Sequence, residues 1–334
     1  MSRRVDDTMP EPTRVEVLSN LYDRLSPEER DELLRCLLMA APRGGEAVLR
    51  VLDDELLCRV TESPLEERGA PAPTERHASA IVPLPLSMSP TAPYGAVVAG
   101  ADGCRTGWFV VIQNLRTGET EHHTVPDFAS LLCACGGADV IAVDIPIGLL
   151  EDIEEGGRRC RGVDDLARAR LKPYRTCCVF SAPLRPAIAC ETYEEAVAAT
   201  QAHSSKDCSL SKQAFGLFRK LREVDALMTP EGQARVREVH PELCFAHMNN
   251  DSPLLEGKKT PEGRALRIEL LRTAGFEISD ESVSKLAKHG VGRDDVLDAY
   301  AACWTAGRIA RGQATCLGEG SAPDARGLRM EMWF

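Results

Sequence analysis

Acidic residues stand at four places where the hydrophobic pattern predicts that a strand ends or a helix begins. They are Asp102, Asp144, Glu238 with its neighbour His240, and Asp295 with Asp298. A carboxylate at the end of a buried strand is costly unless it is paired or binds a cation. Carboxylate oxygens suit Mg²⁺ and Mn²⁺. Two such ions about 4 Å apart can activate a water and stabilise the leaving oxygen of a phosphodiester, so the pattern predicts metal-dependent phosphodiester hydrolysis.

The first two acids belong to strands that come early in the expected order of elements. The apolar runs 97–101 and 108–112 are separated by a polar, glycine-containing turn, which predicts a β-hairpin with Asp102 at its turn. The segment 119–125 is a candidate third strand. The apolar run 140–143 is typical of a strand buried on both faces, and it too is followed by an acid.

A later segment carries the third acidic group. Residues 235–242 alternate like a strand, and a period of two puts Glu238, His240 and Glu242 on one face. Pro241 lacks a backbone donor and is expected to end this strand.

The last acids fall at the start of a helix that is expected over 293–309. Asp295 and Asp298 are three residues apart, so they are neighbours on one helix face. First-turn acids also suit the helix dipole without any ligand, and both interpretations stay open. Helical periodicity predicts further helices at 127–133, 194–202, 210–228 and 261–274.

The segment 156–185 is basic although the whole chain carries a net charge of −11. The segment contains eight basic residues and only two acidic ones, both aspartates, which gives it a net charge of +6. The eight are Arg158, Arg159, Arg161, Arg168, Arg170, Lys172, Arg175 and Arg185. Arginine side chains suit phosphate oxygens, so the segment predicts a phosphate-binding surface that includes Arg158 and Arg159. A solvated helix face is the other interpretation.

The pattern divides the chain into three parts. Residues 1–62 predict an N-terminal helical extension of two amphipathic helices, which we expect to add stability or to contact a protein partner or a second copy. Residues 63–93 contain seven prolines and predict a flexible linker. Residues 94–334 are expected to form the domain that carries the chemistry.

Composition limits the compartments and the binding partners that we expect for this protein. The net charge of −11 argues against attraction of the whole surface to nucleic acid or to an anionic membrane. The N-terminus has no apolar stretch of a secretory signal, and no run approaches the roughly 20 apolar residues of a membrane span. The 13 cysteines are then expected to be reduced thiols. These features predict a cytoplasmic protein without a membrane partner.

Seven stretches match the motifs of a known family in order. They are GADGCRTGW from Gly100, VDIPIGL from Val143, ARARLKPYRTCCVFSAP from Ala167, SKQAFGLFRKLREVD from Ser211, REVHPELCF from Arg237, EGKKTPEGRALR from Glu256 and GRDDVLDAYAA from Gly292. Over roughly residues 95–312 the chain resembles the predicted ribonuclease H-like nucleases grouped as domain of unknown function 429. The order of the expected elements is also that of the ribonuclease H-like fold. We therefore expect an α/β domain with a mixed five-stranded sheet flanked by helices and a basic helical insertion.

The resemblance implies a site that holds two Mg²⁺ or Mn²⁺ ions. In it Asp102 would bridge both ions, Asp144 and Glu238 would each complete one, and Asp295 or Asp298 would close the second site. Nucleic acid is the implied substrate.

Further residues are expected around this site. The resemblance suggests that Arg175, Lys258 and Lys259 belong to the substrate surface. His240 is a candidate to orient a ligand or to transfer a proton.

Two other functions use the same fold. An actin-like ATPase or phosphotransferase also begins with an Asp-Gly turn near phosphate, but it needs a second glycine-rich phosphate loop, and Gly156-Gly157 is too short for one. A non-catalytic nucleic-acid-binding module would keep the fold and use the basic segment alone.

Overall fold

The computed structural model describes residues 96–153, 160–204 and 210–334. The predicted helices within 1–62, the linker at 63–93, and Arg158 and Arg159 lie outside these ranges. Among the described helices, none is both long enough and apolar enough to cross a bilayer.

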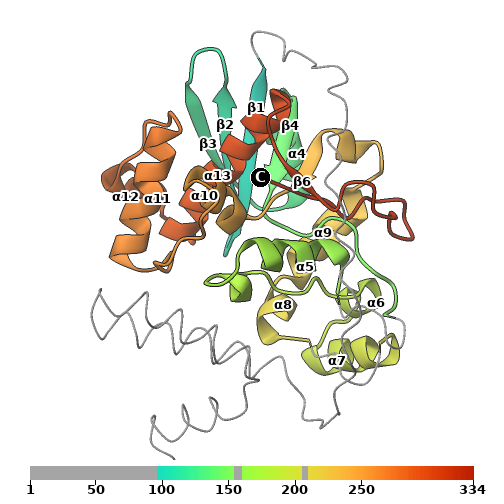
Figure 1. Cartoon of the computed structure of the whole chain (residues 1–334). Helices are drawn as coiled ribbons and strands as arrows, with labels where there is room; N and C mark the ends of the chain where they lie inside the picture. Colours follow the sequence, from blue (N-terminus) through green and yellow to red (C-terminus); the bar gives the residue numbers. More distant parts are fainter. Residues whose placement is uncertain (1–95, 154–159, 205–209) are drawn as a thin grey trace, which may run out of the picture. The chain divides into compact units, whose positions relative to one another are not determined.

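Five strands form one mixed sheet in the order β3-β2-β1-β4-β5 (Figure 1). They are β1 (Val97–Cys104), β2 (Gly107–Asn114), β3 (Thr120–Val125), β4 (Val140–Val143) and β5 (Val236–Glu238). The first three strands are antiparallel neighbours, whereas β4 runs parallel to both β1 and β5. The predicted α/β fold with a mixed five-stranded sheet is confirmed, and this strand order is consistent with the ribonuclease H-like fold.

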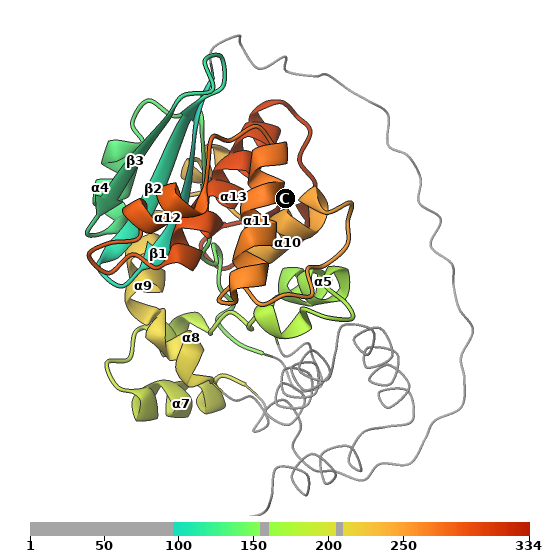
Figure 2. The ribbon, with the colours of Figure 1, turned by 90° about the vertical axis from the view of Figure 1, so that its left-hand side faces the viewer.

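Helices cover both faces of the sheet. They are α4 (Phe128–Ala134), α5 (Gly162–Arg170), α6 (Arg185–Ile188), α7 (Tyr193–Ala202), α8 (Lys212–Gly216), α9 (Phe218–Leu227), α10 (Pro241–Met248), α11 (Pro261–Thr273), α12 (Asp280–Leu286) and α13 (Arg293–Ala310). In Figure 2 the sheet stands between α4 on one side and α13 with α10 and α11 on the other. Helices α5 to α9 come from the long connection between β4 and β5. A short antiparallel pair, β6 (Cys316–Leu317) and β7 (Met332–Trp333), follows α13.

The alternation of side chains divides the core into two clusters. Val98, Val140 and Ala142 face α13, whereas Ala101 and Val143 face the side covered by α4 and α9. A residue's parity along β1 or β4 therefore decides which face it reaches.

The opening hairpin differs from the sequence prediction in one respect. Strand β1 continues to Cys104, and the turn falls at Arg105 and Thr106, so Asp102 pairs with Phe109 inside the strand. Gly107 has a φ of +145°, and any Cβ there would lie 2.0 Å from the carbonyl oxygen of Val125. Glycine is thus required at the first residue of β2, directly after the observed turn.

Two segments depart from the expected helices and strands. The single helix predicted over 210–228 is divided into α8 and α9 at Leu217. Strand β5 ends at Glu238 and does not reach Pro241 as predicted, and Pro241 begins α10, because proline suits the first turn of a helix. Glu242 is therefore a helical residue and not a strand residue.

Helix α13 lies directly on β1 because Gly100 has no side chain. A Cβ at Gly100 would lie 1.9 Å from the amide nitrogen of Cys303 and 2.4 Å from the carbonyl oxygen of Ala299. No side-chain layer separates the helix from the strand at this point. The position of α13 is thereby fixed relative to the sheet.

We expect Gly100→Ala to lower the free energy of unfolding by about 3 kcal/mol, since the backbone of α13 must move to admit the methyl group. Urea titration followed by tryptophan fluorescence measures this, because all three tryptophans lie in the described domain: Trp108, Trp304 and Trp333. Gly216→Ala is the matched control, since nothing lies within 4 Å of a Cβ there. Equal stability of the two variants would contradict the close packing.

Candidate metal centre

Three carboxylates from three elements meet at one edge of the sheet. Asp102 comes from β1, Asp144 directly follows β4, and Asp298 comes from α13. One carboxylate oxygen from each lies within 4.8 Å of the other two. Asp102 is 8% exposed and Asp298 is 1% exposed.

The parallel register of β1 and β4 explains why two of these acids are neighbours. The last paired residues are Ala101 and Val143, so Asp102 and Asp144 come next, side by side. The amide of Asp144 donates to the carbonyl oxygen of Ala101 at 3.0 Å, which extends the ladder by one bond. Both aspartates share the parity of the residues that face α13, and this brings Asp298 to them.

The close approach of the three acids shifts their pKa values upward. Burial, followed by the charges of Asp144 and Asp298, raises the pKa of Asp102 well above its usual range. Burial and the charge of Asp298 raise the pKa of Asp144 to about 7. Burial also raises the pKa of Asp298. Bringing these carboxylates together as anions is costly, and a bound cation would offset that cost.

We expect Asp144→Asn to stabilise the metal-free protein above pH 7. A carboxyl whose folded pKa is raised binds more protons folded than unfolded, so its contribution to stability is lost as pH rises from about 4 to about 7. Asparagine does not titrate, so it causes no such loss of stability. The free energy of unfolding of the variant should exceed that of wild type by about 2–4 kcal/mol at pH 8 and by little at pH 4. Urea titrations in EDTA at both pH values check this. A variant no more stable than wild type at pH 8 would contradict the repulsion.

The three oxygens fit a hard divalent ion. Opposite ligands of Mg²⁺ are separated by roughly 4.2 Å, and those of Ca²⁺ by up to roughly 5 Å. A group whose oxygens lie within 4.8 Å is thus close to the span of a single ion. The ligand type is that preferred by Mg²⁺, Mn²⁺ and Ca²⁺.

Lys258 supplies a positive charge to this group. Its Nζ donates to Oδ2 of Asp298 at 2.6 Å, and its side chain is 37% exposed. Asp298 raises the pKa of Lys258 above its ordinary value. Lys258, which the resemblance assigned to the substrate surface, thus contacts the carboxylate of Asp298 directly, whereas the neighbouring Lys259 is exposed.

Asp295 lies at the rim of the group. Its Oδ2 accepts a hydrogen bond of 2.7 Å from the amide of Gly292, which caps the start of α13. Burial raises the pKa of Asp295, and the charge of Asp298 contributes. Of the two acids expected on this helix, Asp298 joins the three-carboxylate group and Asp295 stabilises the helix start.

The structure does not bring Glu238 to the three aspartates. Glu238 pairs with Val143 in the parallel ladder, and both side chains reach the face opposite Asp102 and Asp144. Its two carboxylate oxygens accept hydrogen bonds of 2.7 and 2.9 Å from Arg161, and Oε2 accepts another of 2.7 Å from the amide of Ile147. The odd-numbered residue Val239 is the one that lies beside Asp144.

Arg161 joins two buried acids. Besides Glu238, it bonds Oδ1 of Asp164 through Nη2 at 2.6 Å and through Nε at 3.1 Å. Arg161 and Asp164 are each 1% exposed, and Glu238 is 3% exposed. An arginine of the predicted phosphate surface is therefore part of the folded core.

His240 lies near Asp144 without contacting the other two aspartates. It precedes α10, and its Nε2 donates to the carbonyl oxygen of Cys178 at 3.1 Å. Its Nδ1 is buried and has no hydrogen-bond partner among the described residues. His240 and Asp144 both line a cavity of about 20 Å³, which is large enough for roughly one water.

Glu242 and Arg267 lie close to the centre and were not assigned to it from the sequence. Glu242, in the first turn of α10, accepts hydrogen bonds of 2.7 and 2.9 Å from Arg267 and one of 3.2 Å from Arg175. Its charge contributes to the raised pKa values of Asp144 and Asp298. Pro241 before it was the available signal of a helix start, whereas Arg267 sits among apolar helix positions and gives no signal.

The five described arginines of the basic segment are all paired inside the chain. Arg161 and Arg175 bond the buried acids already named, Arg168 bonds Asp165, and Arg170 bonds Asp251. Arg185 bonds Glu151, Asp225 and Asp324. These contacts balance the excess charge that the sequence showed. The described part of the segment therefore uses its arginines to hold the fold.

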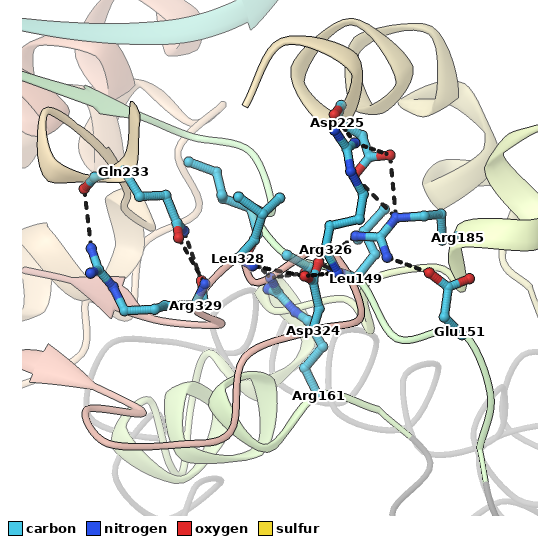
Figure 3. Close-up of polar contacts among 12 residues, drawn as sticks. Leu149, Glu151, Arg161, Arg185, Asp225, Gln233, Asp324, Arg326, Leu328 and Arg329 are labelled. Carbon is cyan, nitrogen blue, oxygen red and sulfur yellow. Dashed lines mark hydrogen bonds and ion pairs between the residues drawn. The ribbon is translucent and has the colours of Figure 1, made fainter. Parts of the chain in front are cut away.

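Figure 3 shows the contacts around Arg185 and Asp324. Asp324 also accepts hydrogen bonds from the amides of Leu149 at 3.0 Å and Leu328 at 2.8 Å. The segment after α13 is thereby fastened to the connection that follows β4. Asp324, at 9% exposure, is a structural acid and not part of the three-carboxylate group.

Comparison with known proteins gives one match. A family described as "Protein of unknown function (DUF429)" matches residues 100–322, which include all three aspartates of the centre. No curated protein and no solved structure matches the chain.

Proposed function

The chain belongs to the DUF429 family, and we propose that it is a divalent-metal-dependent nuclease that hydrolyses phosphodiester bonds of nucleic acid. The observation that carries this proposal is the group formed by Asp102, Asp144 and Asp298, whose oxygens lie within 4.8 Å of one another. The group lies at the edge of a sheet whose strand order is that of the ribonuclease H-like fold.

In this proposal the three aspartates hold Mg²⁺ or Mn²⁺. The ion, when bound, supplies an activated water and neutralises charge on the phosphodiester in the transition state. Asp102 offers an oxygen from within β1, Asp144 offers one from the residue after β4, and Asp298 offers one from a helix that packs on Gly100. Ligands on such elements are held in place before the substrate arrives.

Exposed cations near the centre support a polyanionic substrate. The amide of Arg105, at the β1–β2 turn, donates to the carbonyl oxygen of Gly290 at 3.1 Å, so this turn lies beside the loop that precedes α13. Arg105, Lys259, Lys288 and Arg293 are exposed, and none forms an ion pair with another described residue. They contrast with the internally paired arginines of the basic segment, and they would contact phosphates.

The test is a cleavage assay with the full-length protein. Labelled single- and double-stranded DNA, single-stranded RNA and an RNA–DNA hybrid are incubated with Mg²⁺, Mn²⁺ or EDTA, and ATP is tested in parallel. We expect cleavage of at least one nucleic acid that requires the metal and stops in EDTA. ATP turnover without cleavage, or binding without either reaction, would overturn the proposal in favour of a phosphotransferase or a binding module.

A further inference from the structure

Lys258 places a positive charge directly against one of the three carboxylates of the centre. Its Nζ lies 2.6 Å from Oδ2 of Asp298, a carboxylate that is 1% exposed. The charge of Lys258 also attracts Asp102 and Asp144. One ammonium group thus interacts with all three acids of the centre.

The backbone around Lys258 is fastened to buried groups. Nη1 of Arg267, a fully buried residue, donates to the carbonyl oxygen of Glu256 at 3.1 Å. The hydroxyl of Thr260 donates to the carbonyl oxygen of Gly257 at 3.0 Å and accepts from the amide of Gly263 at 3.0 Å. Because the residues on both sides are held in this way, the lysine enters the centre from a fixed position.

The crossing of the loop and α11 is as close as the crossing of α13 and β1. A Cβ at Gly263 would lie 2.1 Å from the carbonyl oxygen of Gly257, so only glycine allows the loop to lie on the first turn of α11. A glycine, a buried arginine and a helix cap therefore all help to fix the position of Lys258. A lysine on a solvated surface needs none of these.

The charges around the centre balance with a single divalent ion. The neighbouring carboxylates are Asp102, Asp144, Glu242, Asp295 and Asp298, and the neighbouring cations are Arg175, Lys258 and Arg267. When all are ionised the net charge is −2. One divalent ion neutralises it, whereas two ions would leave an excess of two positive charges in a buried site, which is costly.

We propose that Lys258 takes the place of a second metal ion, so that the centre binds one divalent cation per chain. The proposal rests on the metal centre of the proposed function and changes its stoichiometry from two ions to one. In a hydrolytic reaction the ammonium group would stabilise negative charge on the phosphate beside the bound ion.

Mn²⁺ titration followed by electron paramagnetic resonance tests this on the full-length protein after chelation. We expect wild type to bind one Mn²⁺. Lys258→Met should bind Mn²⁺ at least about tenfold more tightly, because a positive charge near the ion is removed. Lys258→Arg should keep the wild-type stoichiometry and affinity to within about threefold. Lys285→Met is the matched control, because Lys285 is 68% exposed and pairs with Glu281 on α12, and this variant should bind Mn²⁺ as wild type does.

The outcomes separate this proposal from the proposed function. Two Mn²⁺ ions bound to wild type, or unchanged or weaker affinity in a folded Lys258→Met, would overturn the role of Lys258. Undiminished Mn²⁺ binding by Asp102→Asn would overturn the metal centre itself. Circular dichroism of each variant establishes that it is folded.

Discussion

We expect Asp102→Asn to lower the rate of metal-dependent cleavage by at least about 10³-fold. Asp102 lies on the central strand β1, and one of its carboxylate oxygens lies within 4.8 Å of an oxygen of both Asp144 and Asp298. The amide of Gly103 donates to its Oδ1 at 2.6 Å. Asparagine keeps the shape but removes a charge that binds the cation. A loss of about 4 kcal/mol of transition-state stabilisation corresponds to this factor.

The matched control is Asp139→Asn. Asp139 is exposed at the opposite end of β4, where its Oδ2 accepts a hydrogen bond of 3.1 Å from the amide of Val97. Asparagine can accept the same bond, so this variant should cleave at the wild-type rate. Initial rates at saturating Mn²⁺ measure both variants. Retained cleavage in Asp102→Asn would show that the activity belongs to another site.

Arg161→Met should destabilise the domain by about 3–5 kcal/mol. The substitution leaves Asp164 and Glu238 as buried acids without their cation, and an unpaired buried charge is far more costly than a lost surface pair. It also removes the donors that Arg161 gives to the carbonyl oxygens of Ile147 and Gly148 at 3.2 and 3.1 Å. These carbonyls lie three and four residues after Asp144, so the variant should bind Mn²⁺ less tightly as well.

Urea titration followed by tryptophan fluorescence measures this change. Arg272→Met is the matched control, because Arg272 and Glu269 form a pair in which both side chains are more than 60% exposed. Its effect should stay within about 1 kcal/mol. Similar stabilities of the two variants would contradict the structural role that we assign to Arg161.

The elements that carry the centre could be predicted from local patterns. The runs before Asp102 and Asp144 are short, apolar and β-branched, so β4 was predicted at its observed bounds and β1 at its observed start, although β1 continues three residues past its predicted end. Asp295 and Asp298 were predicted as alternatives, because both lie near the beginning of a long helix with a clear start. These signals are local, and hydrophobic period and capping residues are enough to find them.

The face of Glu238 could not be predicted in this way. Alternation shows which residues of a strand share a face, but not which of the two faces is covered by α13. That choice is set by the register with β4, a contact between residues about 95 positions apart. Strand β5 has only three residues, so its own pattern carries little information.

The roles of the arginines and of Lys258 also could not be predicted from local sequence patterns. A run of basic residues has the same sequence whether its partners are phosphates or buried acids. Arg161 bonds Glu238 and Arg175 bonds Glu242, across 77 and 67 positions of the chain. Only the folded arrangement shows that these charges are already paired.

The contact of α13 with Gly100 has a consequence for the order in which the domain can open. Because helix and strand touch backbone to backbone, any motion that lifts α13 from β1 also carries Asp298 away from Asp102. The three aspartates therefore cannot hold a cation together while α13 is lifted from β1. A cation that binds only when α13 is packed on β1 would add its binding free energy to the free energy needed to separate them. It would therefore stabilise the contact between the first strand and the last long helix.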